Sequence, residues 1–312
     1  MPSPVAIIDI GSNSIKLLIA ARGARGLPET VFSRTLDTRI SAGISQIPPQ
    51  LGEAGMAAGV AAIRELVGDA VRLGARSTVL VATSAVRDAA NGREFRDRVR
   101  QATGCTIRIL SGIEEANLIG RGLACDPSLA GLRNFYVFDL GGGSLEGLVF
   151  RDRRAVQETS LPLGCVRLTE RCVADPTKPF GPLEGKAVFR AVKTAFGASG
   201  FAFSLASGAA VVGTGGTLTT ARAVLAARAG QAMELADPLL PCDRLRDLLG
   251  GLGALPLAQR TQVPGLPPAR ADVFPTALAT LLAVAEIGDF SAYRHSLYNL
   301  RWGLAAEELA RG

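Results

Sequence analysis

Residues 134–150, NFYVFDLGGGSLEGLVF, organise the rest of the chain. An apolar run ends on Asp139, three glycines and Ser144 follow, and a second apolar run ends on Phe150. Two β-prone runs joined by glycines predict a hairpin. Its turn gathers a carboxylate, a hydroxyl and backbone N–H groups, and glycines let such a backbone approach an anion closely. The stretch therefore predicts either a phosphate-binding hairpin or a tight turn with a structural Asp.

A second copy of this pattern lies near the N-terminus, in residues 8–20, IDIGSNSIKLLIA. Aspartate, glycine and serine recur there at the same offsets, as Asp9, Gly11 and Ser14. Internal repeats of this kind indicate that one structural unit is used twice. The repeat therefore predicts two related domains, each offering a phosphate-binding loop to a shared cleft.

A third glycine-rich loop ends the apolar run 210–217, AVVGTGGT, and a helix is predicted directly after it, over 218–228. A strand, a glycine-rich turn and a helix N-terminus together form an anion-binding arrangement. The spacing is neither that of a Walker loop nor that of a dinucleotide-binding fingerprint. Beside the two hairpins, this loop is interpreted as a third phosphate loop.

Two adjacent acids follow the predicted strand 105–110. Ser111 and Glu114 have the spacing of a capping box, which gives Glu114 a structural role. Glu115 points about 100° away around the helix and is free to face the cleft. Ser84 and Arg87 follow another predicted strand, 78–83, at a position where α/β proteins usually contact ligands.

The remaining pattern alternates strands and helices. Apolar residues at helical spacing predict a helix over 51–73, with Gly74 at its C-terminal end. The other predicted helices are a polar one ending at residue 100, one starting near 164–167, and 183–196, 243–252, 277–287 and 302–309. The other predicted strands are 5–9, 15–21, a strand end at 35–39, 155–163 and a short final strand 296–300, with a loop-like hinge at 122–132.

Composition narrows the class of protein. The chain has 312 residues, five scattered cysteines without a CxxC pair, and a single histidine, His295, which argues against zinc and disulfide frameworks. No run of eighteen apolar residues and no signal-peptide pattern is found, so we expect a cytoplasmic protein that does not contact membranes. The net charge is +6 and thirty of the 34 basic residues are arginine, which suits a polyanionic ligand, although a GC-rich genome also favours arginine.

Six motifs resemble one known family in the order in which that family has them. They are DIGSNSIKLLI, ATSAVRDAANG, SGIEEANLIGRGL, FDLGGGSLE, LPLGCVRLTE and GTGGT. The chain is similar, from about Val5 to Gly303, to the exopolyphosphatases and guanosine pentaphosphate phosphatases of the Ppx/GppA family. This resemblance implies an α/β fold of two actin-like, ribonuclease H-like domains with an active-site cleft between them. The expected domains are 1–124 and 125–312, with the last helix, about 302–311, able to pack back on the first domain.

The resemblance also implies roles for individual residues. Glu115 matches the family's catalytic base, and Asp139 and Glu146 match acids tied to Mg²⁺ or Mn²⁺. The phosphate-binding surface is matched by residues of the three loops and one arginine: Asp9, Gly11, Ser12, Asn13, Ser14, Arg87, Gly141, Gly142, Gly143, Ser144, Gly213, Thr214, Gly215, Gly216 and Thr217.

Three departures from the family pattern affect these expectations. Leu145 stands where the family usually has threonine, which would remove a hydroxyl near the phosphates. The closing segment LYNLRWGL differs from the family's usual GLREGL. The chain ends at Gly312, where longer members continue into a helical domain, so we expect the short two-domain form.

The expected function is an exopolyphosphatase that hydrolyses the terminal phosphoanhydride of inorganic polyphosphate with Mg²⁺. The alternatives are a phosphatase that converts pppGpp to ppGpp in the stringent response, or a regulator that binds polyphosphate or nucleotide without turnover. A sugar kinase is disfavoured, because SGIEEA and TSAVRD suit attack by water. No specific nucleic-acid partner is expected, and a homodimer is left open.

Overall fold

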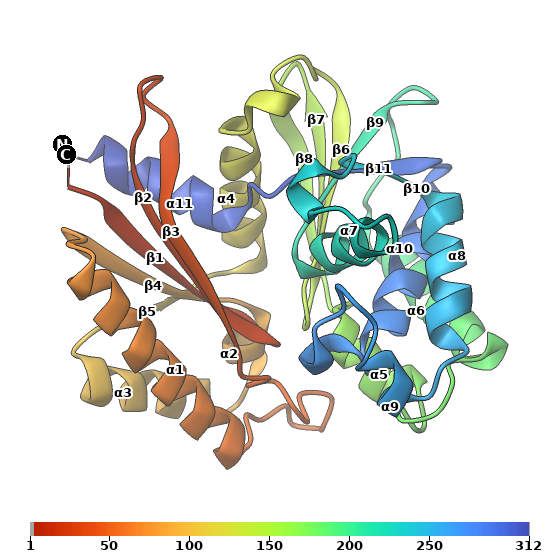
Figure 1. The fold of residues 1–312 in the computed structure, drawn as a ribbon, viewed down its shortest axis with the longest axis horizontal. Coiled ribbons are helices and arrows are strands. Elements are labelled where there is room, and N and C mark those ends of the chain that lie inside the picture. Colours follow the sequence, from red (N-terminus) through yellow and green to blue (C-terminus); the bar gives the residue numbers. More distant parts are fainter. Residues whose placement is uncertain (1–2, 312) are drawn as a thin grey trace. The chain divides into compact units, whose positions relative to one another are not determined.

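The computed structural model describes residues 3–311, which form two compact units, each built on its own β-sheet (Figure 1). Unit 1 contains the residues up to Ala130 together with those from Tyr298 onward. Unit 2 is the continuous segment Gly131–Leu297. The domain boundary expected from the sequence is at 124/125, whereas the two units divide at 130/131 and the segment from Tyr298 belongs to unit 1.

Unit 1 has a five-stranded sheet in the order β3-β2-β1-β4-β5. β1, β2 and β3 are antiparallel neighbours, whereas β1, β4 and β5 run parallel. Its elements are β1 (Val5–Ile10), β2 (Ser14–Arg22), β3 (Pro28–Asp37), α1 (Glu53–Arg72), β4 (Ser77–Ala82), α2 (Ser84–Asp88), α3 (Gly92–Thr103), β5 (Ile107–Ile109), α4 (Gly112–Ala124), the 3₁₀ turn η1 (Pro127–Leu129) and α11 (Leu300–Ala310).

The helices of unit 1 pack on its sheet in two groups. α1 and α3 contact each other, and α1 packs against β1 and β2. On the other side, α11 packs against β1, β2 and α4 (Figure 1). The central strand β1 is almost wholly buried because it carries apolar residues on both faces, as strands covered by helices on both sides do.

Unit 2 has a six-stranded sheet in the order β10-β11-β9-β6-β7-β8. Its helix α10 packs against α5, α6, α7 and α8, and these helices share one apolar core with the sheet. Its elements are β6 (Phe135–Leu140), β7 (Leu145–Arg151), β8 (Arg154–Leu161), α5 (Cys165–Cys172), α6 (Pro182–Ser199), β9 (Ala210–Thr214), α7 (Gly216–Arg228), η2 (Met233–Leu235), β10 (Leu239–Pro241), α8 (Cys242–Gly253), α9 (Leu257–Arg260), η3 (Pro268–Arg270), α10 (Phe274–Gly288) and β11 (Ala292–His295).

The two sheets confirm the repeat predicted from the sequence. From β8 to β11, the strands of unit 2 follow the same order and directions as the five strands of unit 1, and β10 is an addition at the edge. The hairpins also share their register, since Asp9 lies opposite Lys16 and Asp139 lies opposite Glu146. Both units thus have the ribonuclease H-like arrangement of actin-like domains.

Two local predictions were wrong. The final strand is Ala292–His295 and not 296–300. Residues 292–295 pair with β9 and β10. Asn299 instead caps α11, since its side chain accepts from Arg301 N–H at 3.1 Å. The segment 122–132 is not simply a loop, because α4 continues to Ala124 and a 3₁₀ turn follows. Among the described residues, no helix is long and apolar enough to cross a membrane.

Candidate active site

The turn of the first hairpin, in unit 1, is closed by its own backbone. Gly11 N–H donates to the Ser14 carbonyl at 3.2 Å, and Ser12, Asn13 and Ser14 are all buried. The Ser12 carbonyl accepts both the N–H and the hydroxyl of Ser41. The side-chain Nδ2 of Asn13 is buried and has no hydrogen-bond partner. This turn therefore holds a polar donor without a protein acceptor, as expected where an anion binds.

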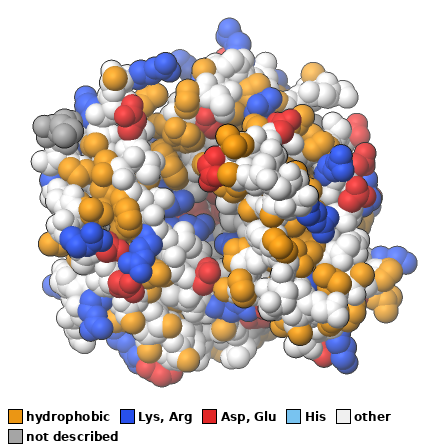
Figure 2. All heavy atoms as spheres, in the orientation of Figure 1, with side chains coloured by type: hydrophobic (Ala, Val, Ile, Leu, Met, Phe, Trp, Pro, Cys, Tyr) orange, Lys and Arg blue, Asp and Glu red, His pale blue; other side chains and the backbone are white. Residues whose placement is uncertain are grey.

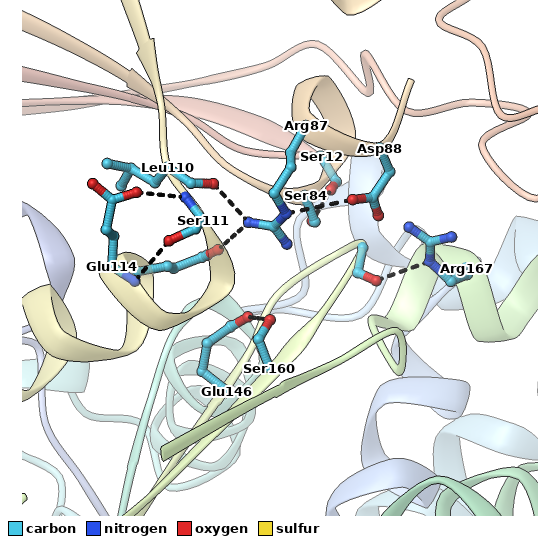
Figure 3. A network of polar contacts seen from close by, with 12 residues as sticks. Ser12, Ser84, Arg87, Asp88, Leu110, Ser111, Glu114, Glu146, Ser160 and Arg167 are labelled. Atoms are coloured by element: carbon cyan, nitrogen blue, oxygen red, sulfur yellow. Dashed lines mark hydrogen bonds and ion pairs between the residues drawn. The ribbon is translucent and has the colours of Figure 1, made fainter. Parts of the chain in front are cut away.

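Glu115 lies nearby in unit 1, in the first turn of α4, and is only 7% exposed. Arg87, from the short helix α2, donates to Glu115 Oε2 at 3.1 Å and to the Leu110 carbonyl at 3.0 Å (Figure 3). Ser84 on the same helix lies 3.5 Å from the Ser12 hydroxyl. Unit 1 thus brings Ser12 and Glu115, from two separate motifs, to the same short helix, where they contact Ser84 and Arg87 respectively.

Glu114 has the structural role expected for it. Its backbone N–H donates to the Ser111 hydroxyl at 3.2 Å, and its carboxylate accepts Ser111 N–H at 2.8 Å. Arg108 donates to the same carboxylate at 2.9 Å. The backbone hydrogen bond from Ser111, aided by Arg108, lowers the pKa of Glu114 to about 2.

The second hairpin turn, in unit 2, is held by hydrogen bonds from the start of α5. Gly141 N–H donates to the Ser144 carbonyl at 3.0 Å, and the first amides of α5 donate to the carbonyls of Gly141 and Gly142 at 2.9–3.2 Å. Arg167 donates through Nε to the Gly143 carbonyl at 3.0 Å (Figure 3). A Cβ at Gly164 would lie 2.2 Å from the backbone of Gly142, which explains the glycine in LPLGCVR. The loop's carbonyls are thus occupied by α5.

The third loop packs directly on the second hairpin. Gly215 has φ = 90°, and a Cβ there would lie 2.2 Å from Asp139 Oδ1. Thr217 donates to the Leu140 carbonyl at 3.4 Å. A Cβ at Gly216 would lie 2.2 Å from a guanidinium nitrogen of Arg270, so this arginine covers the loop. Unit 2 therefore brings together Asp139, both of its glycine loops and the guanidinium group of Arg270.

The paired acids distinguish the two hairpins. Asp139 and Glu146 are opposite residues of β6 and β7, so their side chains lie on the same face of the sheet. Glu146 is 2% exposed and accepts the Ser160 hydroxyl at 2.8 Å (Figure 3). In unit 1 the residue opposite Asp9 is Lys16. Burial raises the pKa of Asp9, and the charges of Lys16 and Arg301 oppose this.

Only the second hairpin therefore has an acid pair suited to a divalent cation. Mg²⁺ is typically held by one or two carboxylates and completes its shell with water and substrate phosphates. Asp139 and Glu146 supply two such carboxylates, and Ser160 orients one of them. Within residues 3–311 no group of three or more histidine, cysteine or acidic side chains could hold a metal alone. The donor set fits Mg²⁺ and not a closed zinc site.

Leu145 is the first residue of β7, directly after Ser144 of the second hairpin turn. Its side chain is wholly buried in the apolar core of unit 2. Leucine at this position therefore adds to the apolar core of unit 2.

The sequence reasoning missed three residues around these loops. Ser160 orients Glu146, Arg270 covers the third loop, and the charge of Arg301 acts on Asp9. Arg270 follows a proline-rich connection and belongs to no motif, so no local pattern indicated it. On the face shown in Figure 2, basic side chains lie scattered among acidic and apolar ones and form no single patch.

Comparisons with known proteins give matches over most of the chain. The model of the Ppx/GppA phosphatase family matches residues 18–311. An uncharacterised protein of Streptomyces coelicolor is 30% identical over 269 residues, which are 85% of this chain and 78% of that protein. Exopolyphosphatase 2 of Mycobacterium tuberculosis is 37% identical over 185 residues, which are 55% of this chain and 56% of that protein. The crystal structure of an exopolyphosphatase from Cytophaga hutchinsonii has the same fold, with a TM-score of 0.87 at 21% identity over 99% of this chain and 98% of that one.

Proposed function

The chain belongs to the Ppx/GppA phosphatase family, which makes it a phosphoanhydride hydrolase, and we propose that it releases orthophosphate from the end of inorganic polyphosphate. The observation that carries this assignment is the buried Glu115 carboxylate, held by Arg87 beside the first hairpin turn. The similarity to a mycobacterial exopolyphosphatase favours polyphosphate over a nucleotide as the substrate.

Phosphoryl transfer needs mainly positioning and charge stabilisation from a protein. We assign Glu115 as the group that orients the attacking water and accepts its proton. Arg87 fixes the Glu115 carboxylate and offers its remaining donors to the phosphate oxygens. In unit 1, the N–H groups of the first hairpin turn and Asn13 Nδ2 are suited to bind phosphate oxygens, and in unit 2 the second and third loops offer N–H groups of the same kind.

Asp139 and Glu146 are proposed to hold Mg²⁺. The ion supplies neutralisation of the charge that develops on the phosphates. Ser160 keeps Glu146 oriented, and Gly215 leaves space for the Asp139 carboxylate. Activity should therefore disappear in excess EDTA and return with Mg²⁺ or Mn²⁺. Full activity in EDTA would exclude this metal assignment.

A phosphate-release assay tests the substrate. We expect the highest kcat/KM with long-chain polyphosphate, a lower value with tripolyphosphate and the lowest with pppGpp. A clear preference for pppGpp would assign the protein to guanosine pentaphosphate hydrolysis. No turnover of any of the three would indicate a binding regulator.

A further inference from the structure

A polar pocket lies in unit 2, along the C-terminal half of α7. It has a volume of about 620 Å³, within the range of small-molecule sites. Its walls come from α7, the segment 231–237, β10 and the start of α8. Apolar side chains line part of it, among them Leu225, Leu239 and Leu240. Its charged lining consists of three arginines, Arg222, Arg228 and Arg244, and two aspartates, Asp237 and Asp247.

Arg222 is the most unusual of these arginines, because it is only 8% exposed. One terminal nitrogen donates to the Ala236 carbonyl at 2.5 Å and, more weakly, to the Glu234 carbonyl at 3.4 Å. Its Nε is buried and has no hydrogen-bond partner. A buried charged donor without an acceptor is costly, so this group is typical of a site that a ligand completes.

The arginines of the pocket wall outnumber its acids by three to two, so the wall as a whole carries a net positive charge. Arg228 and Arg244 are exposed at its edge, and a Cβ at Gly251 of α8 would lie 3.7 Å from the Arg228 guanidinium. The two acids in the wall are Asp237, which accepts Leu239 N–H at 2.8 Å, and Asp247. Guanidinium groups bind phosphate through paired hydrogen bonds.

We propose that this pocket, the Arg222 pocket, binds a small organic phosphate ester whose apolar or aromatic body packs on Leu225, Leu239 and Leu240. The site is separate from the third phosphate loop. That loop meets the N-terminus of α7 at Gly216, whereas Arg228 is the last residue of the same 13-residue helix. At 1.5 Å per residue, Arg222 lies about 9 Å and Arg228 about 18 Å along the helix from Gly216. The inference does not depend on which phosphoanhydride the protein cleaves.

Calorimetric titration with AMP tests the inference, because AMP carries a phosphate ester and an aromatic base but no phosphoanhydride. We expect AMP to bind, and adenosine and inorganic phosphate to bind at least tenfold more weakly. Arg244→Gln should weaken AMP binding about tenfold through loss of a charged contact. Arg246→Gln is the matched control. Arg246 is also exposed and lies on the same helix α8, but it pairs with Asp243 and is not part of the pocket wall.

Three results would overturn the proposal. AMP could fail to bind at millimolar concentration, Arg244→Gln and Arg246→Gln could bind it equally, or excess tripolyphosphate could displace it from the wild-type protein. The last result would place AMP at the phosphate loops. Arg244 is chosen over Arg222 because Arg222 also holds two carbonyls of the covering segment, so its loss could disturb the fold.

Discussion

Two neighbouring acids of α4 have opposite surroundings. Glu115 is buried against Arg87, whereas Glu114 is only half-buried and caps its helix. Glu115→Gln removes the proposed proton acceptor at nearly constant size, so kcat should fall by roughly 10²–10⁴. Glu114→Gln should retain turnover and lose at most about 1 kcal/mol of stability, because glutamine also serves in a capping box. Phosphate-release kinetics and melting temperatures of the two variants measure this.

The same two variants also show which results would contradict the roles assigned to Glu114 and Glu115. An inactive Glu114→Gln beside an active Glu115→Gln would reverse the two roles. Full activity in both would mean that the attacking water is activated by another group.

Glu114 also predicts a pH dependence of stability. Its folded-state pKa of about 2 lies below its ordinary value of 4.5, because Ser111 N–H and Arg108 favour the carboxylate. A lowered acid pKa stabilises the folded state above pH 4.5, and this contribution is lost as the pH falls towards 2. Urea unfolding at pH 5 and pH 3 should therefore show a smaller stability loss for Glu114→Gln than for the wild type. Equal losses would contradict the linkage.

At the scale of elements, α4 and α11 approach unusually closely. A Cβ at Gly303 would lie 2.1 Å from the Leu118 carbonyl, and one at Gly122 would lie 1.9 Å from the Asn299 carbonyl. Gly303→Ala should therefore cost about 1–3 kcal/mol in urea unfolding, because the helices must move apart.

Gly68→Ala is the control for this substitution. Gly68 is exposed in α1 with no atom near its missing Cβ, so alanine there should stabilise the protein by about 0.5–1 kcal/mol through helix propensity. If both variants gained stability, α4 and α11 would not be as close as described.

The hairpins could be predicted from the sequence because their information is local. The continuous apolar runs and the Asp–Gly–Ser offsets fixed both turns and their register. The strand Ala292–His295 could not, because its pairing partners β9 and β10 are distant in sequence and AYRH has no β-branched run. Arg270 reaches the third loop only through the tertiary fold, so no local pattern predicted it. The different roles of Glu114 and Glu115 could be predicted because a capping box is a local pattern.

At the scale of the molecule, the two units differ in continuity. Unit 2 is one segment with its own apolar core, whereas unit 1 needs α11 to cover α4 and β1. A fragment of residues 131–297 should unfold cooperatively in urea. A fragment of residues 1–130 should not, and adding a peptide of residues 298–312 should restore cooperative unfolding. Cooperative unfolding of 1–130 alone would show that α11 is dispensable.

The return of α11 to unit 1 has a consequence for biosynthesis. Arg22 donates to the Leu309 carbonyl at 2.7 Å across 287 positions of sequence. A ribosome adding roughly 5–20 residues per second needs about 15–60 s to make that interval. Throughout it, the nascent β1, and α4 once it has been made, lack their covering helix and expose apolar surface, which a chaperone would recognise. The later-made half of the polypeptide is thus able to reach its native state first, reversing the usual N-terminal-first order of co-translational folding.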